Sequence, residues 1–171
     1  MPFDSRNVSS PRPRPPWWKG ERGEWLVVAQ VILIGLVFFG PRTVSGRPGW
    51  PFPEVCSVVG ILFMAGGGLL LFAGLFRLGR GLTPLPFPKE DAPLVQTGPY
   101  ALVRHPMYSG GLFLALGWAL FIQGWLTLLY VAALFVFLDF KSRREERWLG
   151  GKFSDYGVYQ KRVRKLIPFI Y

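Results

Sequence analysis

The residues best suited to chemistry form two short groups separated by a long apolar stretch. The first is RHPMY at 104–108, which holds an arginine, the only histidine of the chain, a proline, a methionine and a tyrosine. The second is the adjacent pair Glu145 and Glu146. Arginine and histidine bind anions through charge-assisted hydrogen bonds, whereas carboxylates and tyrosine faces attract cations. These residue types are suited to binding a small charged molecule.

The two glutamates also have a simpler interpretation. They lie among five basic residues, Lys141, Arg143, Arg144, Arg147 and Lys152. Side chains four positions apart on a helix are neighbours, so an ion pair between Lys141 and Glu145 is expected. A metal site is not expected, because the chain has one histidine and one cysteine, Cys56. The single cysteine also excludes an intrachain disulfide.

The segments that must position these groups are apolar. The chain has 171 residues, half of them hydrophobic, and four apolar stretches at 25–39, 55–76, 108–122 and 125–138. The first is interrupted only by Gln30, and the second carries no charge. A helix needs about 20 apolar residues to cross a bilayer. The pattern predicts an all-α integral membrane protein with about four transmembrane helices, with the buried helices of a soluble bundle as the alternative.

Two features inside these stretches predict helix packing. Gln123 and Gly124 lie between the third and fourth stretches and indicate the turn of a C-terminal helical hairpin. Gly60, Gly67 and Gly74 are seven residues apart and share one face of the second helix. Small residues on one face let helices approach closely in lipid.

The basic residues predict the topology. Lysine and arginine number five before the first apolar stretch, two at 41–54, four from Arg77 to Arg104 and nine from Lys141 onward. The positive-inside rule therefore places both termini and the middle segment in the cytoplasm. The net charge of +10 then reflects a membrane surface, and no nucleic-acid partner is expected. The Pro/Arg-rich tail at 1–23 does not resemble a secretory signal.

Two cytoplasmic segments have distinctive patterns. Prolines at 84, 86, 88, 93 and 99 block regular helix and predict a rigid, extended loop. Near the C-terminus, Phe153, Tyr156, Tyr159 or Gln160, Val163 and Ile167 recur at helical spacing, with basic residues mostly off that stripe. This predicts an amphipathic helix along the cytoplasmic leaflet, ended by Pro168.

The two chemical groups and their surroundings resemble a known superfamily. The sequence LVQTGPYALVRHPMYSGG at 94–111 is followed by EERWL at 145–149 and by FSDYGVYQKRVRKLIPFI at 153–170. Their order and spacing resemble those of the isoprenylcysteine carboxyl methyltransferases and phospholipid N-methyltransferases. The resemblance covers residues 92–171, and it implies an integral-membrane methyltransferase that uses S-adenosylmethionine. It divides the chain into a cytosolic tail at 1–23, two transmembrane helices at 24–77 and a catalytic region at 78–171.

The resemblance also implies site residues at the cytosolic interface. The implied cofactor contacts are Ala92, Pro93, Leu94, Val95, Tyr100, Arg104, His105, Pro106, Met107, Tyr108 and Glu145. Lys141 and Glu146 are the implied catalytic residues. Lys141 stands where the eukaryotic carboxyl methyltransferases have a substrate-binding arginine, and an ammonium lacks the bidentate fork of arginine.

The acceptor of the methyl group stays open at this point. A lipid amine, a hydrophobic thiol and a lipidic carboxylate are all compatible with an acceptor that enters from the bilayer. Membrane sterol reductases, which use a nicotinamide cofactor, also carry an RHP motif and are one alternative. A non-catalytic membrane protein is the other.

Overall fold

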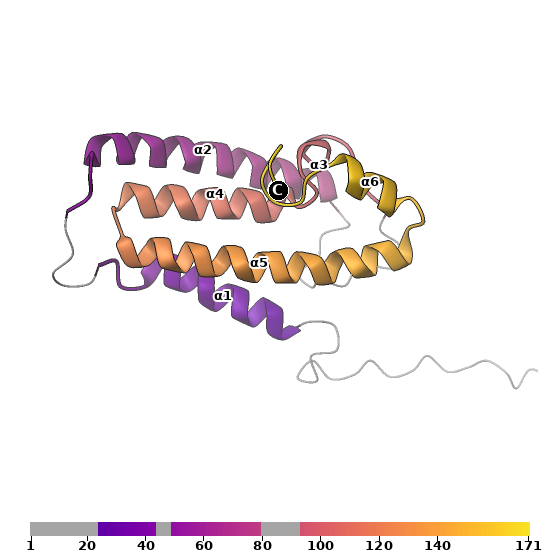
Figure 1. Ribbon diagram of the computed structural model, residues 1–171, viewed down its shortest axis with the longest axis horizontal. Coiled ribbons are helices and arrows are strands. Elements are labelled where there is room, and N and C mark those ends of the chain that lie inside the picture. The colour runs from indigo at the N-terminus through magenta and orange to yellow at the C-terminus, as the bar shows by residue number, and fades with distance from the viewer. Residues whose placement is uncertain (1–23, 44–48, 80–92) are drawn as a thin grey trace, which may run out of the picture.

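Six helices make up the part of the chain that the structure, a computed structural model, describes: residues 24–43, 49–79 and 93–171 (Figure 1). They are α1 (Glu24–Phe39), α2 (Pro53–Leu78), α3 (Pro99–Leu102), α4 (Pro106–Phe121), α5 (Trp125–Lys152) and α6 (Tyr156–Arg162). The predicted all-helical fold is confirmed over these ranges. The N-terminal tail, the prolines at 84, 86 and 88, and Ala92 lie outside the described residues.

The lengths of the apolar helices support a membrane protein. The helices α2 and α5 have 26 and 28 residues and are long and apolar enough to cross a membrane. The helices α1 and α4 are also apolar, but each has 16 residues, fewer than the roughly 20 needed for a full span. Two membrane-spanning helices are therefore supported within the described ranges, and the total of four stays a prediction.

The helices α2 and α4 lie side by side along a seam of glycines (Figure 1). A Cβ atom added to Gly67 would lie 2.7 Å from the carbonyl oxygen of Gly110, and one added to Gly117 would lie 2.5 Å from that of Gly60. Both distances are shorter than real contacts, so only glycine permits this approach. The predicted packing face of α2 is confirmed, whereas its glycine partners on α4 were not predicted.

The same seam reaches the RHPMY motif. A Cβ atom on Gly74 would lie 3.1 Å from Cγ of Pro106 and 3.2 Å from Cγ of Met107. Proline is favoured in the first turn of a helix, where its missing N–H has no helical partner. Pro106 thus begins α4 and rests on α2, which fixes where the polar residues before it must lie.

A tight turn joins α4 to α5, as predicted from Gln123 and Gly124. Gln123 adopts a positive φ of 55° between Phe121 and Trp125, the residues that end and begin the two helices. Its side-chain amide donates a hydrogen bond of 3.2 Å to the carbonyl oxygen of Pro53. The turn is thereby tied to the start of α2.

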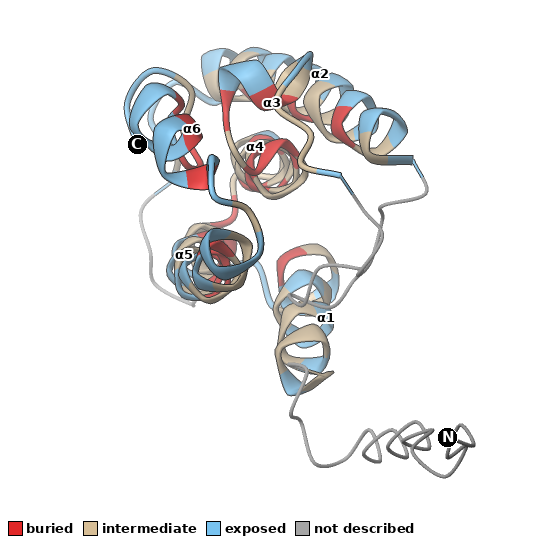
Figure 2. Ribbon diagram, turned by 90° about the vertical axis from the view of Figure 1, so that its right-hand side faces the viewer, coloured by how far each residue is buried: buried red, intermediate tan, exposed pale blue. Residues whose placement is uncertain are grey.

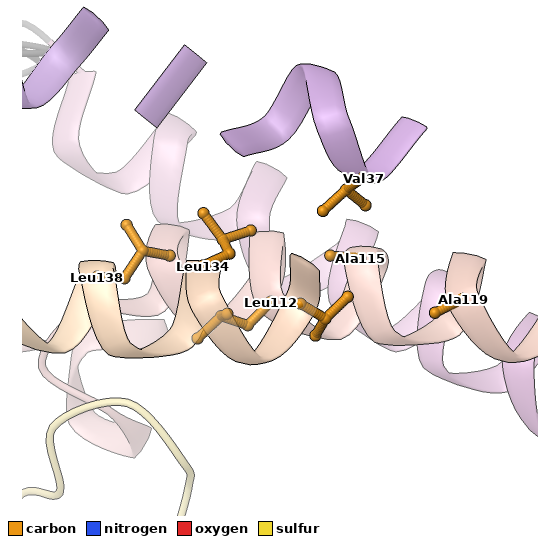
Figure 3. Packing of buried hydrophobic residues seen from close by; sticks show 7 residues of the cluster. Val37, Leu112, Ala115, Ala119, Leu134 and Leu138 are labelled. Carbon is orange, nitrogen blue, oxygen red and sulfur yellow. The ribbon is translucent and has the colours of Figure 1, made fainter. Parts of the chain in front are cut away.

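The hydrophobic core lies where α1, α4 and α5 meet (Figure 3). Its buried residues are Val37, Leu112, Ala115, Ala119, Val131, Leu134 and Leu138. Figure 2 shows α4 in the middle, with α1, α2 and α5 around it. The central position of α4 explains its many small buried residues, because helices can approach it from several sides.

The helix α5 continues unbroken past the apolar stretch that was predicted to end at Leu138. It runs to Lys152 and so carries Lys141, Glu145 and Glu146 on one rigid rod. At 1.5 Å per residue its 28 residues extend about 42 Å, which exceeds a hydrocarbon core of about 30 Å. The helix is therefore long enough to cross such a layer and to carry its charged end beyond it.

The C-terminal amphipathic helix is shorter than predicted and faces the protein. The helix α6 ends at Arg162, and Val163 is extended. Residue 164 instead forms a parallel β-bridge with Val103. Tyr156, Tyr159 and Val163, the predicted membrane-facing stripe, are 2%, 3% and 5% exposed and pack with Leu94, Leu149 and Phe153. The interpretation of the stripe as a leaflet-binding surface was therefore wrong, because the protein itself buries it.

We predict that Gly67→Ala destabilises the protein by about 1–3 kcal/mol, the usual cost of overpacking a tight interface. Gly66 is the matched control, because a Cβ atom there meets nothing within 4 Å. Gly66→Ala should be neutral or stabilise by up to about 1 kcal/mol, as alanine favours helix. Both variants are compared by their free energy of unfolding in detergent. Equal effects of the two substitutions would contradict the close glycine contact between α2 and α4.

Candidate active site

The RHPMY motif is held by the C-terminal segment through its backbone. The amide of Arg104 donates to the carbonyl of Arg164 at 2.8 Å, and that of His105 donates to the carbonyl of Lys165 at 3.2 Å. The chain is extended at Val103, just after α3. This short pairing turns both side chains toward α5 and α6 before α4 begins.

Glu146 lies at the centre of a buried polar cluster. Arg104 Nε donates to its Oε1 at 2.7 Å, and His105 Nε2 lies 3.1 Å from the same oxygen. Gln160 Nε2 donates to Oε2 at 3.0 Å. The side chains of Arg104, His105 and Glu146 are only 9%, 6% and 8% exposed. Both carboxylate oxygens are engaged, and they connect residues next to α4 with α5 and α6.

Arg104 also determines where α6 ends. Its Nη1 donates to the carbonyl oxygens of Gln160, at 2.9 Å, and Val163. Carbonyls at the end of a helix lack helical partners, and a nearby cation satisfies them. This is the physical reason why the predicted helix stops before Ile167.

Glu145 points to a second, more open part of the site. Tyr108 donates its hydroxyl to Glu145 Oε2 at 3.0 Å, and His105 Nδ1 lies 3.7 Å from the same oxygen. The side chain of Glu145 is 27% exposed, much more than that of Glu146. The rings of His105 and Tyr108 stack with centroids 5.4 Å apart. The adjacent glutamates thus have different surroundings.

Tyrosines complete the wall next to α3. Tyr159 donates its hydroxyl to the carbonyl of Tyr100 at 2.6 Å. Burial raises the pKa of Tyr159 to about 12. Burial, and then the nearby charge of Glu145, also raise the pKa of Tyr100 above its ordinary value. Both phenols therefore stay neutral at physiological pH.

Lys141 is buried one helical turn before Glu145. It is 2% exposed, its Nζ donates to Oε1 of Gln30, and the ammonium lies 5.3 Å from the centre of the Tyr108 ring. The helix α1 thereby contributes to the site through Gln30. Sequence reasoning missed this role, although a single polar residue within an apolar stretch was the available signal.

The remaining predicted cofactor residues divide into two groups. Pro106 and Met107 pack toward Gly74 of α2, as described above. Leu94 packs beneath α6, Pro93 is exposed and Val95 is half-buried. The structure brings together the polar members of the predicted site, whereas Ala92 lies outside the described residues.

A comparison with known protein families identifies the group to which this arrangement belongs. Residues 55–156, from the start of α2 through the glutamate pair, match the phospholipid methyltransferase family. The chain belongs to that family. The matched residues include the glycine seam between α2 and α4, the RHPMY motif and the glutamate pair. The resemblance to membrane methyltransferases in the sequence is confirmed.

Curated relatives include two isoprenylcysteine enzymes. The chain is 31% identical over 121 residues to the protein-S-isoprenylcysteine O-methyltransferase of Saccharomyces cerevisiae, covering 68% of this chain and 51% of the relative. It is 33% identical over 112 residues to the Schizosaccharomyces pombe protein of the same name, covering 63% and 48%. The chain thus spans about half the length of these two relatives.

A third relative is the cobalt-zinc-cadmium resistance protein CzcN of Cupriavidus metallidurans. It is 29% identical over 152 residues, which cover 85% of this chain and 62% of the relative. Within 24–43, 49–79 and 93–171, no group of three His, Cys, Asp or Glu side chains is placed to hold a metal ion. This likeness therefore adds no functional residue to the site.

We predict that Glu146→Gln destabilises the protein far more than Glu145→Gln does. The first change leaves the Arg104 guanidinium buried without its anion, and breaking such a pair costs about 3–5 kcal/mol. The second changes a partly exposed carboxylate and should cost about 1 kcal/mol or less. Thermal unfolding in detergent measures both variants, and equal losses would show that the two glutamates have equivalent structural roles.

Proposed function

We propose that this chain binds S-adenosylmethionine beside His105, Tyr108 and Glu145 and transfers its methyl group to a lipophilic acceptor. One observation carries the proposal: Tyr108 and Glu145, 37 residues apart in the sequence, are joined by a hydrogen bond at the ends of apolar helices. The family membership supports methyl transfer. The cofactor and the acceptor are our inference.

The residues beside Glu145 fit the chemistry of this cofactor. S-adenosylmethionine supplies, when bound, an electrophilic methyl group on a sulfonium centre. Its ammonium group requires an accessible anion, and Glu145 is the more exposed of the two glutamates. The faces of Tyr100 and Tyr108 can attract cationic groups, and the backbone of 93–95 is a further cofactor contact that the resemblance implies. Methyl transfer is then accelerated mainly by positioning.

Arg104 takes a different role from the one that the resemblance implies. Its Nε and Nη1 are already bonded to Glu146 and to two carbonyl oxygens of the C-terminal segment. We therefore propose that Arg104 positions Glu146 and α6, and that His105 faces the cofactor. Pro106 and Met107 support the site by seating α4 on α2.

The surroundings of Glu146 and Lys141 favour an acceptor that needs no base. A protonated amine must lose a proton before it can accept a methyl group. Both oxygens of Glu146 are engaged by hydrogen-bond donors, which makes it a poor proton acceptor. Lys141 places a cation near Tyr108 that would attract an anion. We therefore favour a lipidic carboxylate or a thiolate over a lipid amine.

The proposal also places the site at the cytosolic interface, and it favours a methyltransferase over a reductase. With both termini in the cytoplasm, the charged end of α5 places the site at the cytosolic interface, within reach of acceptors from the bilayer. Membership of the phospholipid methyltransferase family argues against a nicotinamide-dependent reductase. A non-catalytic membrane protein is an outcome that the following experiment can reveal.

We predict that the purified chain binds S-adenosylmethionine and that Glu145→Gln weakens binding by roughly tenfold to a hundredfold. Loss of one charged hydrogen bond costs about 1.5–3 kcal/mol. Lys161→Gln is the control, because Lys161 is exposed on α6 and its replacement, like Glu145→Gln, changes the net charge by one unit. Calorimetry measures the affinities. Binding of a nicotinamide nucleotide instead, or of neither cofactor, would refute the proposal.

We predict that Lys141→Met raises the KM for an anionic acceptor by about tenfold and leaves cofactor affinity within about twofold, because one charged contact is worth about 1.5 kcal/mol. Methionine keeps the buried volume while removing the charge. Labelled S-adenosylmethionine and a set of lipidic carboxylates, thiols and amines separate the acceptor classes. An unchanged KM for every accepted substrate would exclude Lys141 from acceptor binding.

A further inference from the structure

A groove lies between α5 and α6, and Glu146 and Gln160 of the buried polar cluster form part of its wall. Its volume is about 720 Å³, and its lining includes Phe140, Arg143, Arg147 and Tyr156. Residues two positions apart on a helix point about 200° away from each other. Arg143 therefore lies on the flank of α5 opposite to Lys141. Figure 2 shows α6 and α1 on different sides of α5, so the groove and the contact of Lys141 with Gln30 lie on different sides of that helix.

The groove carries positive charge that is available to a ligand. Arg147 is exposed, and no hydrogen bond or ion pair is found for it among the described residues. The side chain of Arg143 is 63% exposed and donates to Asp139 and to the Tyr171 hydroxyl. A guanidinium has five N–H donors, so Arg143 retains donors for an anion. Two arginines one turn apart are well suited to a phosphate group.

A buried hydroxyl at the groove provides a second, independent indication of a ligand. Tyr156 lines the groove, is 2% exposed, and its hydroxyl has no hydrogen-bond partner within the described ranges. Buried polar groups are nearly always satisfied, by protein, by water or by a ligand. A phosphate oxygen, or a water that it orders, would satisfy this one.

An apolar stripe continues from the groove along α5. Leu129, Val136 and Phe140 are 62%, 66% and 53% exposed. Leu129, Val136, Phe140, Arg143 and Arg147 follow one another along α5 at spacings of seven, four, three and four residues. These spacings keep all five on one face of the helix. An acyl chain lying on the stripe would place its headgroup against the two arginines. This continuity favours a lipid over a soluble anion.

We propose that this groove binds an anionic phospholipid, with its phosphate held by Arg143 and Arg147 and an acyl chain lying on Leu129, Val136 and Phe140. The two arginines lie on the flank of α5 opposite to Lys141, whereas Glu146 separates the groove from the rest of the site. A bound lipid would contact α5 and α6 together and would brace the Glu146 cluster from outside.

Native mass spectrometry of the delipidated full chain, titrated with phosphatidylglycerol in the absence of S-adenosylmethionine, tests this site. The Arg143→Gln, Arg147→Gln double variant should bind phosphatidylglycerol about 25-fold more weakly, because each basic residue near a lipid headgroup contributes about fivefold. Lys161→Gln, which removes an exposed charge from α6 outside the groove, should bind like the wild type. If the double variant does not fold, Arg147→Gln alone should lose about fivefold.

Three results would overturn the proposal: unchanged binding in both arginine variants, an equal loss in Lys161→Gln, or equal wild-type affinity for phosphatidylcholine. Inorganic phosphate forms a further arm of the titration. If it displaced phosphatidylglycerol at equal concentration, the groove would be a site for a soluble anion, and the lipid assignment would be wrong. The measurement does not depend on methyl transfer, so either proposal can fail without the other.

Discussion

The ion pair between Arg104 and Glu146 is the interaction on which the arrangement of the site depends. A buried charge is costly unless it is paired and hydrogen-bonded, and here a single carboxylate binds Arg104, His105 and Gln160. These three residues come from the segment before α4 and from α6. The pair therefore fixes the relative positions of the motif, the charged end of α5 and the C-terminal segment, and leaves Glu145 more accessible to a ligand.

The membrane helices provide the rigid frame that this ion pair requires. Glycines let the backbones of α2 and α4 come into contact. This contact fixes the position of Pro106 along α2, and with it the position of the polar residues just before Pro106. The unbroken helix α5 is long enough to carry the glutamates beyond an apolar layer, and the same helix packs against α1 and α4. The site is thus built on helices, and α1 reaches it through Gln30.

The sequence was sufficient to predict the features that depend on local pattern. Apolar stretches, the Gln123–Gly124 turn and the glycine face of α2 each reflect spacing within one segment, and the structure confirms them. The end of α6 could not be predicted in this way, because it depends on Arg104, which is 59 residues away from Val163. The contact between Gln30 and Lys141 spans 111 residues and required the packed helices to be known. The sequence could not show that Glu146 is buried and Glu145 partly exposed, because the two residues are adjacent and identical.

Hydrogen–deuterium exchange of the wild-type chain, with and without S-adenosylmethionine, tests the central claim most directly. The claim is that residues 99–110 and 156–166 form one cofactor-binding unit held by Glu146. Because a ligand stabilises the structure that binds it, the cofactor should slow exchange in both segments together, including at the amides of Arg104 and His105, which bond to the C-terminal segment. Protection of one segment alone, or unchanged exchange in both, would contradict the account.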